Sequence, residues 1–241
     1  MPPQTGKRAH MRNSILANLD LPDLAALGPC LERVTLRERM ILQEPQKKVE
    51  YVYFIEHGIV SVRIVSAGSI LEMAVVGHRG AIGASFLLGG HVVTHQSIVM
   101  VGGSALRIRV EDLRRVMEER PNIHDHLARY VQALLLHCAQ TGLCGVRHEL
   151  EQRLASWLCL TSDALNGQVL PVTHDYLSLA LGLRRTGITQ TLSRFEEQGL
   201  IRKMRGVLQI DQHKKLEKKA CNCYAIIAGA YASPRKSEPG I

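Results

Sequence analysis

The sequence predicts an α+β fold: an N-terminal antiparallel β-roll, then a long helix, then a small helical unit that ends in a β-hairpin. Three observations predict it. Between residues 30 and 110, short β-branched runs alternate with glycine-containing turns, which is typical of antiparallel rolls and sandwiches. Between residues 122 and 144, apolar residues recur at helical spacings of three and four. Between residues 171 and 212, two short helical patterns precede two short strand-like runs.

Length and composition restrict the class of protein. The chain has 241 residues, of which 46% are hydrophobic and 4% aromatic, with a formal net charge of +8. This length suits one or two domains. The scarcity of aromatic residues argues against a single-strand binder built on stacking, but less against a protein that reads the grooves of a duplex. Without a long apolar run or a signal-peptide pattern, we expect a cytoplasmic protein that has no membrane partner.

The N-terminal part of the chain predicts a basic tail followed by the β-roll domain. Residues 1–14, which include Lys7, Arg8 and Arg12, are expected to form a mobile tail. The domain follows over residues 15–121 and begins with a short helical pattern that Pro22 interrupts. Its expected strands, separated by glycine-containing or polar turns, are residues 34–36, 40–42, 51–55, 59–65, 71–76, 96–101 and 105–108.

Residues 122–145 predict one long helix with a narrow apolar stripe. The stripe consists of Leu127, Tyr130, Val131, Leu134, Leu135 and Cys138. The pattern alone leaves two interpretations open. The stripe can pack on its own domain, as the apolar face of a surface helix does. It can also pair with the same helix of a second copy in a parallel dimer.

Residues 146–220 predict a winged helix-turn-helix, and residues 221–241 a C-terminal tail. Thr173 suits the N-cap of a first helix that Gly182 ends, and a second helix is expected over residues 185–198, ended by Gly199. Two short strands around residues 204–206 then form the wing. Residues 173–219 contain ten basic and five acidic side chains, so this unit carries more than half of the net charge.

The second helix of this unit has a polar face that suits the major groove of DNA. If Ile188, Leu192 and Phe195 point inward, the helical period places polar residues on the opposite face, which is free of acidic side chains until residues 196 and 197. Arg and Gln can bond base edges in a bidentate way, and Thr and Ser suit phosphates or base edges. We expect base-edge contacts from Arg185, Thr186, Thr189 and Gln190. We expect phosphate contacts from Arg184, Ser193, Arg194, Lys203 and Arg205. The alternative is a solvated helix in a helical bundle.

These patterns resemble the CRP/FNR family of bacterial transcription regulators over about residues 15–212. The most specific likeness is Tyr176-Leu177-Ser178-Leu179-Ala180-Leu181-Gly182-Leu183, followed by Ile188, Leu192-Ser193-Arg194-Phe195 and Gly199-Leu200-Ile201. Turns in the roll, residues 53–60 and 77–83, are similar to turns of the family's effector domain. The resemblance implies a cyclic-nucleotide-binding-like jelly roll, residues 122–145 as a dimerisation helix, and a homodimer that reads a palindromic operator on double-stranded DNA. It also makes RNA polymerase a candidate partner.

The chain departs from the family's effector sites, so the effector stays unknown. In cyclic-nucleotide-binding members, a Gly-Glu and then an Arg-Ser/Thr pair follow the glycine-rich turn. Here Ala84 follows Gly83, and residues 95–97 read His-Gln-Ser. A cyclic phosphate would lose its strongest charge-assisted partner, so we do not expect cyclic-nucleotide binding. The iron–sulfur members carry an N-terminal cysteine cluster, whereas Cys30 is the only cysteine in the first 130 residues, so no iron–sulfur motif is present.

No metal site and no enzymatic activity are predicted. Cys221-Asn222-Cys223 is an isolated pair, and two ligands do not complete a four-coordinate site. No nucleophile–base pair, paired carboxylates or phosphate-binding loop emerges from the sequence. We expect a homodimeric DNA-binding regulator. The alternative is a small-molecule or redox sensor whose winged helix contacts protein instead of DNA.

Overall fold

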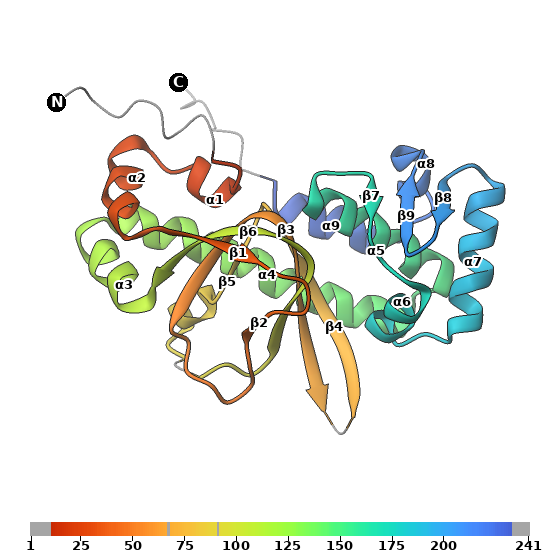
Figure 1. Cartoon of the computed structure of the whole chain (residues 1–241), viewed down its shortest axis with the longest axis horizontal. Helices are drawn as coiled ribbons and strands as arrows, with labels where there is room; N and C mark the ends of the chain where they lie inside the picture. Colours follow the sequence, from red (N-terminus) through yellow and green to blue (C-terminus); the bar gives the residue numbers. More distant parts are fainter. Residues whose placement is uncertain (1–10, 67, 91, 233–241) are drawn as a thin grey trace.

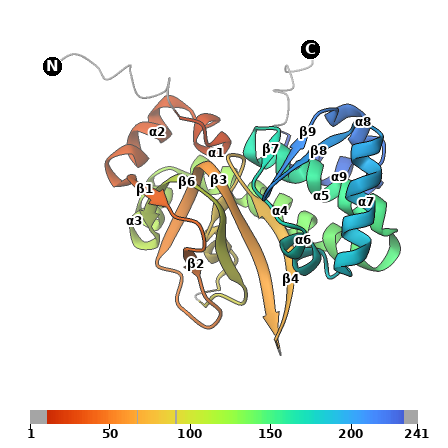
Figure 2. The same ribbon diagram turned by 45° about the vertical axis from the view of Figure 1, so that its right-hand side comes forward.

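A computed structural model describes residues 11–66, 68–90 and 92–232 of the chain. An N-terminal β-roll and a smaller C-terminal domain lie side by side, and the long helix α4 (Pro121–Arg147) extends from one to the other (Figures 1 and 2). This arrangement confirms the predicted order of roll, long helix and helix-turn-helix unit. None of the helices in the described ranges has the length and hydropathy that crossing a bilayer requires.

The roll is an antiparallel sheet in which β1, β6, β3 and β4 are neighbours in that order, while β2 pairs with β6 and β5 with β3. The strands are β1 (Glu32–Leu36), β2 (Ile41–Gln43), β3 (Tyr51–Ser66), β4 (Ser69–Val76), β5 (Ala81–Ile82) and β6 (Gln96–Arg109). A short 3-10 helix, η3 (Ala84–Leu88), follows β5.

The predicted strand breaks at residues 57–58 and 102–103 are wrong, because β3 and β6 continue through them. The pairing of β3 with β6 shifts in register around His57 and Ile59, so both strands pass these positions without a turn. Gly58 has a φ of +89°, and a Cβ there would lie 2.4 Å from the carbonyl oxygen of Val101. Glycine is therefore needed for a bulge within one strand, where we had expected a turn between two.

The predicted basic tail is wrong at its C-terminal end. Asn13 is fully buried, and its side chain accepts hydrogen bonds from the N–H groups of Ile15 and Leu16 as the N-cap of α1 (Ser14–Ala17). The N–H groups of Arg12 and Asn13 both donate to the carboxylate of Glu56. The folded domain therefore begins before residue 14, and residues 1–10 of the predicted tail lie outside the described residues. The helices α2 (Leu21–Leu27), η2 (Gly28–Cys30) and α3 (Val110–Glu119) complete the N-terminal domain.

The apolar stripe predicted for α4 packs mainly on its own chain. Leu127, Tyr130 and Val131 are buried in the N-terminal core, and the Tyr130 hydroxyl donates to the carbonyl oxygen of Ala81 at 2.7 Å. Leu134 and Cys138 are partly buried against the roll, whereas Leu135 is exposed. The assignment of Leu127, Tyr130 and Val131 to a dimer contact is therefore wrong, because these side chains fill the space between α4 and the sheet.

The C-terminal domain has a core that includes Trp157, Leu177, Ile188, Leu192 and Phe195, and this core is continuous with Ile59, Val75 and Met100 of the roll. Its elements are α5 (Leu150–Leu165), β7 (Val169–Leu170), α6 (His174–Leu181), α7 (Arg185–Glu197), β8 (Ile201–Met204), β9 (Val207–Ile210), α8 (His213–Glu217) and α9 (Asn222–Ala230).

The predicted tail over residues 221–241 is wrong for its described part, because the helix α9 lies there. Tyr224 and Ile227 are buried, and α9 packs against both α4 and α5. The helix is short and apolar without a clear stripe, which explains why its sequence did not predict a docked element. Residues 233–241 of that prediction lie outside the described residues.

Candidate nucleic-acid interface and interdomain contacts

The helix pair α6–α7 is built as the sequence predicts. The Thr173 hydroxyl caps α6 by accepting a hydrogen bond from the N–H of Tyr176 at 3.1 Å, and Gly182 ends the helix with a φ of +60°. Arg184 precedes α7 without a side-chain cap. A Cβ at Gly187 would lie 2.6 Å from a methyl group of Leu150, so this glycine lets α7 approach the start of α5 closely.

The residues expected to contact base edges lie on the exposed face of α7. Arg185, Thr186, Thr189 and Gln190 are exposed, while Ile188 is fully buried beneath them. The Nε atom of Arg185 lies 2.6 Å from the carboxylate of Asp175 in α6, and the side chains of this pair are 67% and 73% exposed. Exposed ion pairs contribute little to stability, so the Arg185 guanidinium can exchange Asp175 for another acceptor.

The residues expected to contact phosphates flank this face, and two of them, Ser193 and Lys203, are hydrogen bonded to each other. Lys203 in β8 donates to the hydroxyl of Ser193 at 3.0 Å and pairs with Glu196 at 2.9 Å. The backbone N–H and the ammonium of Lys203 lower the pKa of Glu196. The guanidinium of Arg194 lies 3.5 Å from the carboxylate of Glu151 in α5. Arg184 and Arg205, the latter at the tip of the wing, are exposed.

A buried carboxylate connects the roll to the C-terminal domain. Glu72 in β4 is 5% exposed and accepts hydrogen bonds from Ser61 in β3, Trp157 in α5 and Tyr176 in α6. Burial raises the pKa of Glu72, and the three hydrogen bonds oppose this shift. The sequence did not indicate this contact, because these residues are far apart in the chain.

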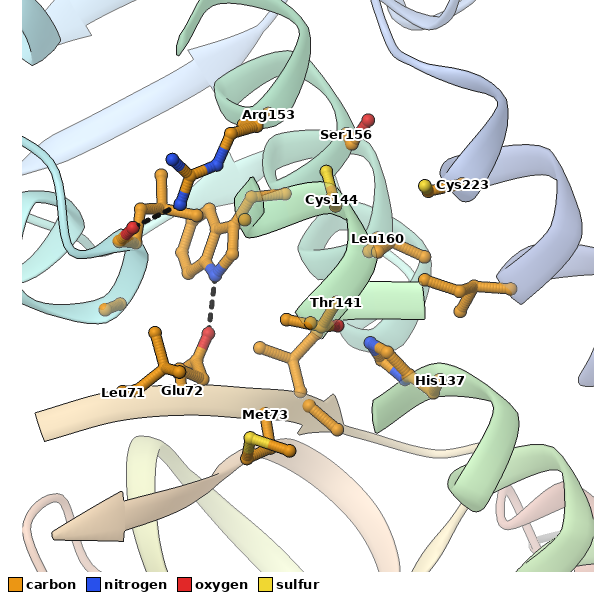
Figure 3. Close-up of a pocket in the computed structure, with 18 of the residues that line it drawn as sticks. Leu71, Glu72, Met73, His137, Thr141, Cys144, Arg153, Ser156, Leu160 and Cys223 are labelled. Carbon is orange, nitrogen blue, oxygen red and sulfur yellow. Dashed lines mark hydrogen bonds between the residues drawn. The ribbon is translucent and has the colours of Figure 1, made fainter. Parts of the chain in front are cut away.

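A cavity of about 310 Å³ lies beside Glu72, between β4, α4, α5, α6 and α9 (Figure 3). Its wall is mainly apolar and includes Leu71, Met73, Leu160 and the ring of His137. Burial lowers the pKa of His137 to about 4, so this side chain is neutral near pH 7. The volume is at the lower end of the range for small-molecule sites.

Comparisons with known proteins identify the C-terminal domain. Residues 152–219 match the family model for the Crp-like helix-turn-helix domain. This part of the chain is called the Crp-like domain below, after the model that it matches. The comparison with curated protein sequences gave no significant match.

Over 79–86% of its length, the chain shares its fold with solved structures that include a CRP/FNR-type regulator. It superposes on FixK2 from Bradyrhizobium japonicum with a TM-score of 0.68 at 16% identity, covering 79% of this chain and 98% of FixK2. A protein from Eubacterium rectale assigned to the crp/fnr family gives 0.65 at 16% identity, with 86% and 98% coverage. CLP, the c-di-GMP-responsive regulator of Xanthomonas campestris, gives 0.65 at 15% identity, with 79% and 99% coverage. The fold that the family resemblance implied is thereby confirmed.

Side chains of the segment where the resemblance would place a cyclic nucleotide contribute to the core and to hydrogen bonds of the roll. Ala84, Phe86 and Val93 are buried in the N-terminal core. Ser97 is fully buried and donates to Gln43, and Gln96 accepts a hydrogen bond from Arg63. The expectation that the roll does not bind a cyclic nucleotide through the Glu/Arg pair stays a prediction.

Three cysteines and a histidine meet at the boundary between α4 and the Crp-like domain. Cys144 and His148 lie one turn apart at the C-terminal end of α4, and Cys221 and Cys223 lie at the N-terminus of α9. The Cys144 and Cys221 sulfur atoms are 3.4 Å apart. The sequence prediction of no metal site treated Cys221 and Cys223 as an isolated pair, because the other two residues of this cluster are more than 70 positions away.

Proposed function

We propose that the protein is a transcription regulator that binds specific sites on double-stranded DNA as a homodimer. One observation carries the proposal: the exposed face of α7 in the Crp-like domain presents Arg185, Thr186, Thr189 and Gln190 without an acidic side chain among them. Such a face can enter the major groove without repelling phosphates, and its arginine and glutamine can read guanine and adenine edges. We propose that the flanking basic residues Arg184, Lys203 and Arg205 contact phosphates.

The dimer is proposed to form through an exposed face of α4 that lies beside the buried stripe. Along this face, Leu135 is 55% exposed and Val146 is 82% exposed. The residues on it recur at alternating spacings of three and four, the pattern of a two-stranded coiled coil, and they are Gln132, Leu135, Ala139, Gly142 and Val146. Leu136 and Leu143 flank it and are exposed as well. A symmetric pair of α4 helices would present two copies of α7 related by a two-fold axis, which matches the two-fold symmetry of a palindrome.

The cellular context follows from this proposal. A regulator of this type acts in the cytoplasm, where its operator and RNA polymerase are found, and RNA polymerase is a proposed partner at the promoter. Since Ala84 follows Gly83 and residues 95–97 read His-Gln-Ser, the usual Glu/Arg pair is missing, and we propose an effector other than a cyclic nucleotide held by that pair.

DNA binding is tested by fluorescence anisotropy with fragments from upstream of the protein's own gene. We expect a specific complex that resists excess competitor DNA, and a logarithm of the binding constant that falls linearly with the logarithm of salt concentration. Binding without salt dependence, or no preference among fragments, would contradict the proposal. A winged helix that contacts protein instead of DNA would then be favoured.

A further inference from the structure

Four side chains that can bind a metal converge where α9 meets the C-terminal end of α4. Their ligand atoms, the sulfurs of Cys144, Cys221 and Cys223 and a ring nitrogen of His148, all lie within 4.8 Å of one another. The distance between the Cys144 and Cys221 sulfurs is 3.4 Å, and that between the Cys223 sulfur and Nδ1 of His148 is 3.5 Å. The chain thus supplies four ligands from two helices that are distant in sequence.

The Cys144–Cys221 and Cys223–His148 separations are close to the edge lengths of a zinc coordination tetrahedron. With Zn–S bonds of about 2.3 Å and Zn–N bonds of about 2.0–2.1 Å, neighbouring ligand atoms lie roughly 3.5–3.8 Å apart. We propose that Cys144, His148, Cys221 and Cys223 bind one Zn²⁺ ion. Thiolate and imidazole ligands in a tetrahedral set select zinc over magnesium or calcium, which prefer oxygen.

The surroundings of the cluster suit three thiolates. Cys221 is the N-cap of α9 and Cys223 lies in its first turn, so both sulfurs face the positive end of the helix dipole. The Ser156 hydroxyl accepts a hydrogen bond from the N–H of Cys221 and lies 3.1 Å from its sulfur. Arg153 lines the same cavity wall as Cys144 and Cys223 (Figure 3) and offsets part of the net negative charge of a Cys3His zinc centre. Ser156 is thus positioned as an outer-shell partner of the ligand Cys221.

The site would be structural, because the four protein ligands complete the tetrahedron and leave no position open for water. The site would also link α9 to the junction between α4 and α5. Cys144 and His148 end α4, and α5 of the Crp-like domain begins two residues later, at Leu150. Zinc would therefore hold α9 against the junction between the long helix and the DNA-binding domain. This inference does not depend on the proposed dimer or on DNA binding.

The metal content of the full-length chain tests the proposal directly. We expect the reduced protein to retain one zinc per chain after dialysis, measured by inductively coupled plasma mass spectrometry. Replacement by Co²⁺ should produce thiolate-to-cobalt charge-transfer absorption and the intense ligand-field bands of a tetrahedral site. Cys223→Ser and His148→Ala should each lose the retained zinc. Cys138→Ser removes a thiol of α4 that lies outside the cluster, and this variant should retain the zinc.

A second measurement avoids variants that fail to fold. In the wild-type chain, zinc should protect three of the six cysteines against a thiol-specific reagent, and peptide mapping should locate the protection at Cys144, Cys221 and Cys223. The proposal is overturned if the reduced wild-type chain takes up no zinc, or if the cluster variants retain zinc as the Cys138→Ser control does. It is also overturned if a Cys144–Cys221 disulfide forms equally with and without zinc, since those two thiols would then act as a redox pair.

Discussion

The carboxylate of Glu72 in the β-roll accepts a hydrogen bond of 2.7 Å from the hydroxyl of Tyr176 in the Crp-like domain. The indole N–H of Trp157, in the same domain, donates to the other carboxylate oxygen. A single buried acid in β4 therefore holds two helices of the DNA-binding domain against the effector roll. Because an unpaired buried polar group costs more than a hydrogen bond contributes, this contact favours one placement of the two domains.

Removing the Tyr176 hydroxyl should loosen this contact. Tyr176→Phe keeps the ring but deletes one donor to Glu72, so we expect the free energy of unfolding to fall by about 1–3 kcal/mol. Urea denaturation followed by Trp157 fluorescence measures the change, since Trp157 is the only tryptophan. Tyr51→Phe, in β3 of the roll, is the matched control. Equal stability of Tyr176→Phe and the wild type would show that the hydrogen bond does not hold the domains.

Stability should depend on pH through Glu72. Burial raises the pKa of this carboxyl in the folded protein, against hydrogen bonds from Ser61, Tyr176 and Trp157 and the charge of Arg63. The folded state therefore keeps a proton that the unfolded chain releases, and the contribution of Glu72 is largest below its ordinary pKa. This contribution decreases as pH rises through the raised folded-state pKa.

The Glu72→Gln variant isolates this effect, because glutamine does not titrate. We expect the free energy of unfolding of the wild type, but not of Glu72→Gln, to include a component that is lost as the pH rises above the ordinary glutamate range. Glu119→Gln, an exposed change on α3, should behave like the wild type. Parallel pH profiles for wild type and Glu72→Gln would exclude Glu72 as the source.

Base readout by α7 should be separable from phosphate contact. Arg185→Ala and Gln190→Ala should each weaken binding to the preferred site by about 1–3 kcal/mol and relax the preference at one base pair. Arg205→Ala should instead weaken binding to all sequences similarly and reduce the slope of the salt dependence by about 1. Competition assays with sites substituted at single base pairs measure both effects.

The control for these variants is Arg115→Ala, which removes an exposed arginine of α3 outside the Crp-like domain. It should bind DNA as the wild type does. An Arg185→Ala protein with an intact fold and an unchanged base preference would remove Arg185 from the readout residues.

A charge on the exposed face of α4 should prevent dimer formation. Leu135→Asp would place a carboxylate in the centre of the proposed seam, so we expect monomers in sedimentation velocity at concentrations where the wild type is dimeric. Specific DNA binding should be lost at the same time. Asn122→Asp introduces the same charge at an exposed position of α4 off the seam and should remain dimeric. A dimeric Leu135→Asp protein would place the dimer contact elsewhere.

Local sequence patterns determined the elements of this protein and the order of its domains. The change from short β-branched runs to helical spacing near residue 110, and the Thr173 cap and Gly182 stop of α6, depend on neighbours within a few residues. The same periodicity placed Ile188 in the core and Gln190 on the surface of α7. Such features are readable from the sequence because one helical turn or one pleat sets which side chains share a face.

Only the tertiary structure decided which distant residues meet and which apolar face of α4 is left exposed. Helical spacing identified Leu127, Tyr130 and Val131 as apolar, but the position of the sheet determined that they are covered by their own chain. The Glu72–Tyr176 contact and the cluster of Cys144, His148, Cys221 and Cys223 join residues separated by 70 positions or more. No local spacing encodes such pairs, because they depend on how the roll, α4 and α9 pack together in three dimensions.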